Sequence, residues 1–250
     1  MILPELPILL SLAAGALAAG FVSGFSGFGA ALVASGFWFL VVAPDIVPPL
    51  VVTAGLAGQI LGYFRLRRAM SFSKAVPFVT GGVFGVPIGI ALLSVAAPSA
   101  LRLSVGIFLV GYTVFQMSGL SRISIGQWGG LTADRVIGFL GGILGGFTGL
   151  SGPVPLVWVQ LRGIPAREQR AYYQPYNLVM LALAFVGMAL AGRMGAGFWP
   201  LAGIVVPLTL IGAAIGVRCY QGSGEAMLRR IILLLLCISG LVLIGQTFKV

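Results

Sequence analysis

The sequence contains no histidine and very few carboxylates. Only five Asp and Glu residues occur among 250, and each falls at the edge of an apolar segment: Glu5, Asp45, Asp134, Glu168 and Glu225. Without histidine the chain lacks the commonest metal ligand and the usual proton shuttle at neutral pH. An enzyme needs acids, bases or nucleophiles in a shielded place. We therefore expect no enzyme activity, no catalytic residue, and no metal or cofactor site.

Charge and cysteine are also scarce. Charged residues make up 8% of the chain, whereas a soluble domain has about 25%. Hydrophobic residues reach 59% and the mean hydropathy is +1.09. The two cysteines, Cys219 and Cys237, lie at or inside apolar segments without metal-binding spacing, so we interpret them as packing residues. The composition predicts a membrane protein whose main surroundings are the lipid bilayer.

The apolar runs are about 20 residues long, which suits transmembrane helices rather than the alternating ten-residue strands of a barrel. We therefore expect an all-α polytopic membrane protein. The runs cover approximately residues 7–43, 46–64, 75–94, 99–118, 133–161, 171–191, 198–218 and 228–247. Six of them suit a single crossing.

The first and fifth runs do not suit a single crossing. Run 7–43 would be about 55 Å long as one helix, since each residue adds 1.5 Å. Run 133–161 is rich in glycine and ends its glycine stretch with Pro153 and Pro155. Because glycine and proline at this density interrupt helices, each run is expected to form two half-helices that meet at a glycine-rich tip. The second hairpin is expected to be re-entrant, and the depth of the first is left open.

An internal repeat supports this interpretation. The segment Gly24–Gly27 (GFSG) returns as Gly146–Gly149 (GFTG), and Gly85–Gly89 returns as Gly212–Gly216. The two pairs occur in the same order with offsets of 122 and 127 residues, so the chain contains two copies of one unit. For the glycines at 85, 89, 212 and 216 we favour a role in close helix packing.

Loop charge decides between topologies. If each broken run returns to the side it started from, twelve of the 15 Lys and Arg residues fall on one side. If both runs cross, this bias disappears, so the positive-inside rule favours hairpins. Each half then has a broken or re-entrant hairpin plus three transmembrane helices, and the halves are inverted repeats. We expect repeats at 1–118 and 133–250, a cytoplasmic linker at 119–132, and both termini on the periplasmic or outer side of the inner membrane.

The hairpin tips combine glycine with small hydroxyl side chains. Half-helix N-termini near the middle of the bilayer present unpaired N–H groups and a positive dipole end, which favours an anion. A role in close helix crossing is the alternative for these glycines. The candidate binding residues at the tips are Ser23, Gly24, Ser26, Gly27, Gly29, Thr148, Gly149, Ser151 and Gly152.

Polar residues in two further helices are expected to flank the tips. Thr53 and Gln59 follow a proline pair in the first half, and Gln174, Tyr176 and Asn177 surround Pro175 in the second. An amide in a membrane helix is costly unless it is paired. These residues are therefore either part of the binding site or polar contacts that hold two helices together, and the sequence leaves both interpretations open.

The net charge of +10 does not indicate nucleic-acid binding, because the Lys and Arg residues lie in short loops and form no basic stripe. Coupling of transport to protons or another ion is left open. Asp45 and Glu168, near the hairpin mouths, are the candidates for such coupling. The alternative is that both are solvated charges at helix ends.

The two tip sequences, residues 20–29 (GFVSGFSGFG) and 142–156 (GILGGFTGLSGPVPL), together with residues 162–166 (RGIPA), resemble the sulfite exporter TauE/SafE family, also called the toluene-sulfonate uptake permeases. The resemblance covers nearly the whole chain. It implies secondary transport, often export, of small sulfur-containing anions such as sulfite or organosulfonates. From the architecture we expect alternating access, with the site between the two tips. The first half departs from the family pattern at Ala30 and Ala31, so the two tips are not expected to bind equally.

Two other functions stay open at this stage. One is a passive anion channel of the same architecture, and the other is a membrane scaffold subunit that transports nothing. The sequence does not decide the substrate, the direction of transport or the oligomeric state.

Overall fold

The structure is a computed structural model that describes residues 6–26, 29–66, 71–120, 123–219 and 225–248. These residues form ten α-helices and no strand, so the all-α prediction is confirmed. The first five helices are α1 (Leu6–Ser26), α2 (Ala30–Trp38), α3 (Val47–Leu66), α4 (Phe72–Val95) and α5 (Pro98–Met117). The last five are α6 (Gly130–Thr148), α7 (Pro153–Leu161), α8 (Ala166–Leu190), α9 (Phe198–Cys219) and α10 (Glu225–Thr247).

Seven of the described helices are long and apolar enough to cross a membrane, namely α1, α3, α4, α5, α8, α9 and α10. A polytopic membrane protein is therefore confirmed. α2 and α7 have only nine residues each. At 1.5 Å per residue they are about 13 Å long, roughly half the thickness of the hydrocarbon core.

The broken runs differ from the prediction in one respect. The first leg of each is not a half-helix: α1 has 21 residues and α6 has 19, so each approaches the thickness of the bilayer core. The glycines inside them do not end the helix, because each costs only about 1 kcal/mol in a helix interior and allows close packing. After α6 the chain turns at Gly149, whose φ of 82° is in the left-handed region that glycine adopts easily.

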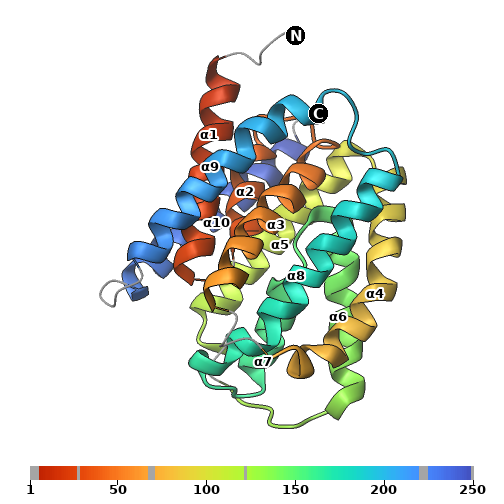
Figure 1. The fold of residues 1–250 in the computed structure, drawn as a ribbon, viewed down its shortest axis with the longest axis vertical. Helices are drawn as coiled ribbons and strands as arrows, with labels where there is room; N and C mark the ends of the chain where they lie inside the picture. Colours follow the sequence, from red (N-terminus) through yellow and green to blue (C-terminus); the bar gives the residue numbers. More distant parts are fainter. Residues whose placement is uncertain (1–5, 27–28, 67–70, 121–122, 220–224, 249–250) are drawn as a thin grey trace.

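Two close helix crossings form the flanks of the bundle (Figure 1). At one of them α1 packs against α9, where Gly20 and Gly24 lie directly against the backbone of Thr209 and Ala213. A Cβ atom added to either glycine would overlap a carbonyl oxygen of α9.

The other crossing joins α4 and α6 and is built the same way. Gly142 and Gly146 of α6 lie against the backbone of Gly82 and Val86 of α4. The glycines predicted to serve packing take part in both crossings: those at 85 and 89 face the α6 backbone, and those at 212 and 216 face the α1 backbone. That prediction is confirmed.

The centre of the bundle is formed by α2, α3, α7 and α8, which lie between the two flanks (Figure 1). α3 and α8 run antiparallel, because Gly55 contacts Leu181 whereas Gly62, two turns further on, contacts Gln174. The large side chains of Trp38, Leu50 and Tyr176 are fully buried here. The N-terminal ends of the two short helices therefore lie inside the molecule.

Candidate functional site

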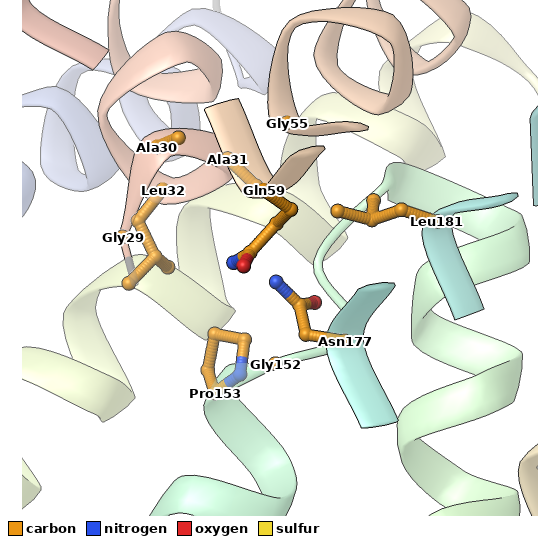
Figure 2. A pocket seen from close by; sticks show the side chains of 10 residues that line it. All are labelled: Gly29, Ala30, Ala31, Leu32, Gly55, Gln59, Gly152, Pro153, Asn177 and Leu181. Carbon is orange, nitrogen blue, oxygen red and sulfur yellow. The ribbon is translucent and has the colours of Figure 1, made fainter. Parts of the chain in front are cut away.

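A small pocket lies where the two short helices approach α3 and α8 (Figure 2). All four elements contribute to its wall. The lining residues are Gly29, Ala30, Ala31, Leu32, Gly55, Gln59, Gly152, Pro153, Asn177 and Leu181. Four of these belong to the predicted set, namely Gly29, Gln59, Gly152 and Asn177. The pocket thus brings together one part of each predicted tip and one amide from each predicted flanking helix.

Both short helices begin at this pocket. Gly29 is the N-cap of α2, and its φ of 91° again suits glycine. Gly152 is the N-cap of α7. The backbone N–H groups in the first turn of a helix have no partner within it, and the dipole places partial positive charge there. The positive ends of two helices therefore converge on one small space.

The two helix ends are not equal as hydrogen-bond donors. Pro153 and Pro155 occupy the first turn of α7, and proline has no N–H group. The first turn of α2 contains Ala30, Ala31 and Leu32, all of which keep theirs. Direct donation to a ligand would come mainly from α2, while α7 would contribute chiefly its dipole.

Two amide side chains complete the polar part of the pocket. Gln59 and Asn177 are almost fully buried, at 3% and 9% exposure, and point toward each other across the space (Figure 2). The Ser151 hydroxyl donates a hydrogen bond of 2.6 Å to Oδ1 of Asn177. This bond orients the amide so that its nitrogen, a donor, faces Gln59 and the pocket.

The pocket is uncharged and narrow. None of its ten lining residues has an ionisable side chain. The volume that the centre of a water molecule can occupy is about 20 Å³, which leaves room for a ligand of a few heavy atoms but not for a large organic one. Donors without a fixed positive charge can bind an anion and still release it.

Several other predicted residues lie around the pocket without lining it. The Thr53 and Thr148 hydroxyls donate within their own helices, to the carbonyls of Pro49 and Leu144. Ser23 is buried against Gly58 of α3. Gly24 packs against α9, and Gly149 forms the turn after α6, as described above.

The remaining predicted residues lie on α8 or at the first tip. Tyr176 is buried and donates a hydrogen bond of 2.8 Å to the carbonyl of Gly138, which ties α8 to α6. Gln174 is buried against Gly62 of α3. Gly27 and the side chain of Ser26 lie outside the described residues.

Sequence reasoning missed most of the apolar wall. Gly55 lies one turn before Gln59, and Leu181 lies one turn after Asn177. Both share a helix face with an amide already identified, so the i ± 4 spacing could have found them. Ala30, Ala31 and Leu32 have apolar side chains, which do not distinguish them from the rest of a membrane helix in the sequence.

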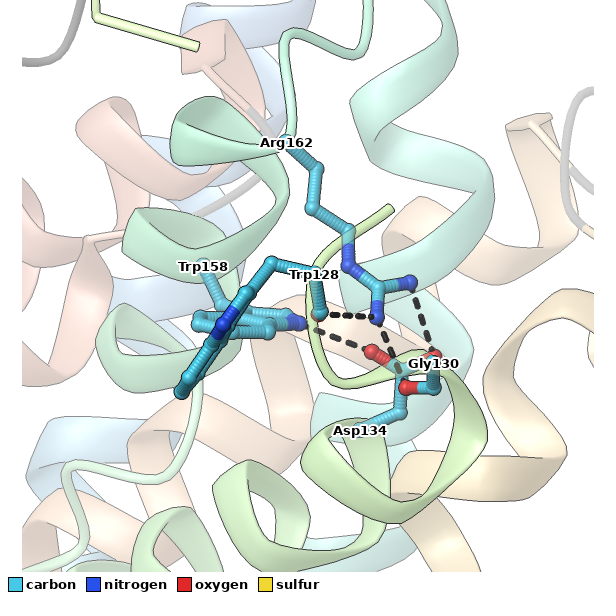
Figure 3. A network of polar contacts seen from close by, with 5 residues as sticks. All are labelled: Trp128, Gly130, Asp134, Trp158 and Arg162. Carbon is cyan, nitrogen blue, oxygen red and sulfur yellow. Dashed lines mark hydrogen bonds and ion pairs between the residues drawn. The ribbon is translucent and has the colours of Figure 1, made fainter. Parts of the chain in front are cut away.

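One carboxylate is buried. Asp134 lies near the start of α6, at a segment edge as expected, and is only 5% exposed. It accepts hydrogen bonds from Nε1 of Trp158, at 2.7 Å, and from the guanidinium of Arg162, at 3.1 Å (Figure 3). Arg162 also donates to the carbonyls of Trp128 and Gly130. The network fastens the end of α7 to the start of α6.

The other two carboxylates considered at the sequence level are more exposed. Asp45 is exposed, and Glu168 forms an exposed ion pair of 3.7 Å with Lys74. Neither lines the pocket. Among the described residues, no group of three or more His, Cys, Asp or Glu side chains could hold a metal ion.

Comparison with known proteins gives one match. The family model described as sulfite exporter TauE/SafE matches residues 12–243, which is nearly the whole chain. No curated protein and no solved structure matches it. The matched range includes every residue that lines the pocket and both glycine crossings.

Proposed function

The chain belongs to the sulfite exporter TauE/SafE family of membrane transporters, and from this premise we propose that it exports sulfite or a similarly small sulfur oxyanion through the pocket between α2, α3, α7 and α8. The observation that carries the proposal is the convergence of two helix N-termini and two buried amides on one uncharged pocket. These groups offer hydrogen-bond donors and positive dipole ends to an anion.

The size of the pocket supports the smaller members of the substrate class. A pyramidal or tetrahedral oxyanion has four or five heavy atoms, whereas an aromatic sulfonate has more than ten. The apolar wall formed by Leu32, Pro153 and Leu181 closes around the polar groups. We therefore place sulfite and its close analogues ahead of large organosulfonates as substrates of this protein.

Alternating access is the proposed mechanism, with residues 1–118 and 133–250 as inverted repeats. In support, α1 of the first half packs in parallel on α9 of the second, and α6 of the second packs in parallel on α4 of the first. α5 and α10 run antiparallel, since Gly106 contacts Gly240 whereas Thr113 contacts Leu233. An in-plane pseudo-two-fold axis would relate these contacts in pairs.

In this mechanism one half rocks against the other around the pocket, so that the anion is reached first from one side and then from the other. The glycine crossings each join one helix of one half to one helix of the other. Their smooth backbone-to-backbone surfaces would allow sliding without large side chains that interlock.

Flux measurements in proteoliposomes test the proposal. A transporter should show saturable sulfite flux, and unlabelled sulfite inside the vesicles should accelerate entry of labelled sulfite. A channel would show flux that follows the anion gradient at high turnover, without counterflow. A scaffold subunit would show neither flux nor a thermal shift with sulfite, sulfate, thiosulfate or small sulfonates. Either of the last two results would contradict the proposal.

A further inference from the structure

The face of α8 that carries Asn177 continues as a polar line toward the start of the helix. Gln174 lies one turn before Asn177, and Arg170 lies one turn before Gln174. This i, i+4, i+7 spacing places all three on the same side of the helix. At 1.5 Å per residue, Arg170 lies about 10 Å along the helix from the pocket.

α3 presents a matching smooth face to this line. Gly55, Gln59 and Gly62 have the same spacing, and the two helices run antiparallel. Nε2 of Gln174 lies 3.2 Å from where a Cβ atom of Gly62 would stand. Because residue 62 has no side chain, Gln174 of α8 lies directly against α3 in this seam, whereas Gly55 faces the apolar Leu181.

Exposure changes along the line. Arg170 is half-buried at the end of the seam, and Gln174 is 2% exposed. Gln174 therefore lies between the half-buried Arg170 and the pocket. An anion that travelled along the seam would meet Arg170 first, then the amide of Gln174, and then Asn177 and Gln59.

Arg170 also contacts the first hairpin. Its Nη2 donates a hydrogen bond of 3.3 Å to the carbonyl of Phe25, in the last turn of α1. This carbonyl lies in the last turn of α1, where carbonyl groups commonly pair with groups outside their helix. An oxyanion adds the attraction of opposite charge and can accept two parallel bonds from a guanidinium, so it would compete well with this carbonyl for Arg170.

From these contacts we propose that Arg170 and Gln174 form an entry subsite for the transported oxyanion, between the start of α8 and the pocket. The inference rests on the proposed function of the pocket. Arg170 attracts the anion and holds it by charge-assisted hydrogen bonds, and Gln174 passes it to Asn177. Arrival of the anion weakens the bond from Arg170 to Phe25 and so loosens the first hairpin.

The test is sulfite transport in oriented proteoliposomes at low and at high ionic strength. Sulfite is added on the side of the membrane nearer to Arg170. Arg170→Gln should raise KM about tenfold at low salt, because it removes an unscreened charge from the entrance, and the difference from wild type should shrink at high salt. The maximal rate should change little. Arg170→Lys keeps the charge and should retain most of the affinity and its salt dependence.

Two further variants complete the design. Arg230→Gln removes an exposed arginine from α10, away from the seam, and should leave KM unchanged. Gln174→Leu should raise KM to a similar degree at both ionic strengths, since it removes a neutral hydrogen-bonding group. Gln174→Leu also tests the subsite independently if Arg170→Gln does not fold.

The outcomes separate the two proposals. If wild type transports sulfite but Arg170→Gln keeps the wild-type KM, whether or not its maximal rate falls, the subsite is wrong and Arg170 only anchors the hairpin. If Arg170→Gln does not fold, an unchanged KM in Gln174→Leu overturns the subsite. If wild type neither binds nor transports any sulfur oxyanion, the function of the pocket is wrong and the subsite falls with it.

Discussion

Gln59 and Asn177 meet in the pocket as neutral amides from two different helices (Figure 2). Asn177 is the sole asparagine in the chain, and the hydroxyl of Ser151 fixes its orientation. Amides can present N–H donors to an anion without the strong attraction of a full positive charge. The sign of the charge in the pocket should therefore decide whether an anion enters.

Replacement of Gln59 by Glu should therefore impair transport strongly. A carboxylate in the pocket repels an oxyanion, and like charges brought together at a buried site cost several kcal/mol. We expect the affinity for sulfite to fall at least about a hundredfold, since each 1.4 kcal/mol corresponds to a factor of ten. Gln127→Glu makes the same chemical change at an exposed position in the linker and should have no effect. Equal KM values for the two variants would exclude Gln59 from the site.

Asp134 supports stability rather than the pocket. In Asp134→Asn the buried guanidinium of Arg162 loses its charge partner, which should lower the free energy of unfolding by about 3–5 kcal/mol. Lys74→Gln, which breaks an exposed ion pair, should cost less than about 1 kcal/mol. Thermal unfolding in detergent measures both. Similar losses in the two variants would show that the Asp134 pair contributes no more than a surface pair.

At the scale of helices, the structure depends on glycines that face a neighbouring backbone. Gly146→Ala adds a methyl group where the carbonyl of Val86 already lies, so the crossing of α6 on α4 must open. Overpacking of this kind typically destabilises a protein by about 1–3 kcal/mol. The variant should unfold at a lower temperature than wild type.

Gly111→Ala is the matched control for this substitution. Gly111 lies inside α5, and an added Cβ would meet nothing within 4 Å. Alanine should there stabilise the helix by about 0.5–1 kcal/mol, because glycine is the poorer helix former. If both variants lose stability equally, glycine flexibility rather than close approach explains the crossings.

The sequence predicted that the glycines at 85, 89, 212 and 216 serve close helix packing, and it predicted two helix breaks, because glycine repeats and prolines are local signals. It did not predict that α1 and α6 are full-length helices. Glycine lowers helix propensity wherever it stands, and only the facing backbone of α9 or α4 explains why Gly20, Gly24, Gly142 and Gly146 remain helical. The burial of Asp134 was missed for a similar reason, since its partners Trp158 and Arg162 are more than 20 residues away.

At the scale of the molecule, the proposed inverted-repeat topology predicts that the linker at residues 119–132 lies in the cytoplasm. In a background in which Cys219 and Cys237 are replaced by Ser, Gln127→Cys should react with a membrane-impermeant maleimide only after the cells are opened. Gly195→Cys, between α8 and α9, should react in intact cells. Both positions are exposed. Labelling of position 127 from outside would contradict the topology.

The central claim is that a small sulfur oxyanion binds between the N-termini of α2 and α7. Selenite has the shape and charge chemistry of sulfite and carries an atom with a strong anomalous signal. Anomalous diffraction from selenite-soaked crystals should place selenium within hydrogen-bonding reach of the first turn of α2, Gln59 and Asn177. If selenite inhibits sulfite transport but the selenium in the crystals lies elsewhere in the protein, the proposed site is wrong.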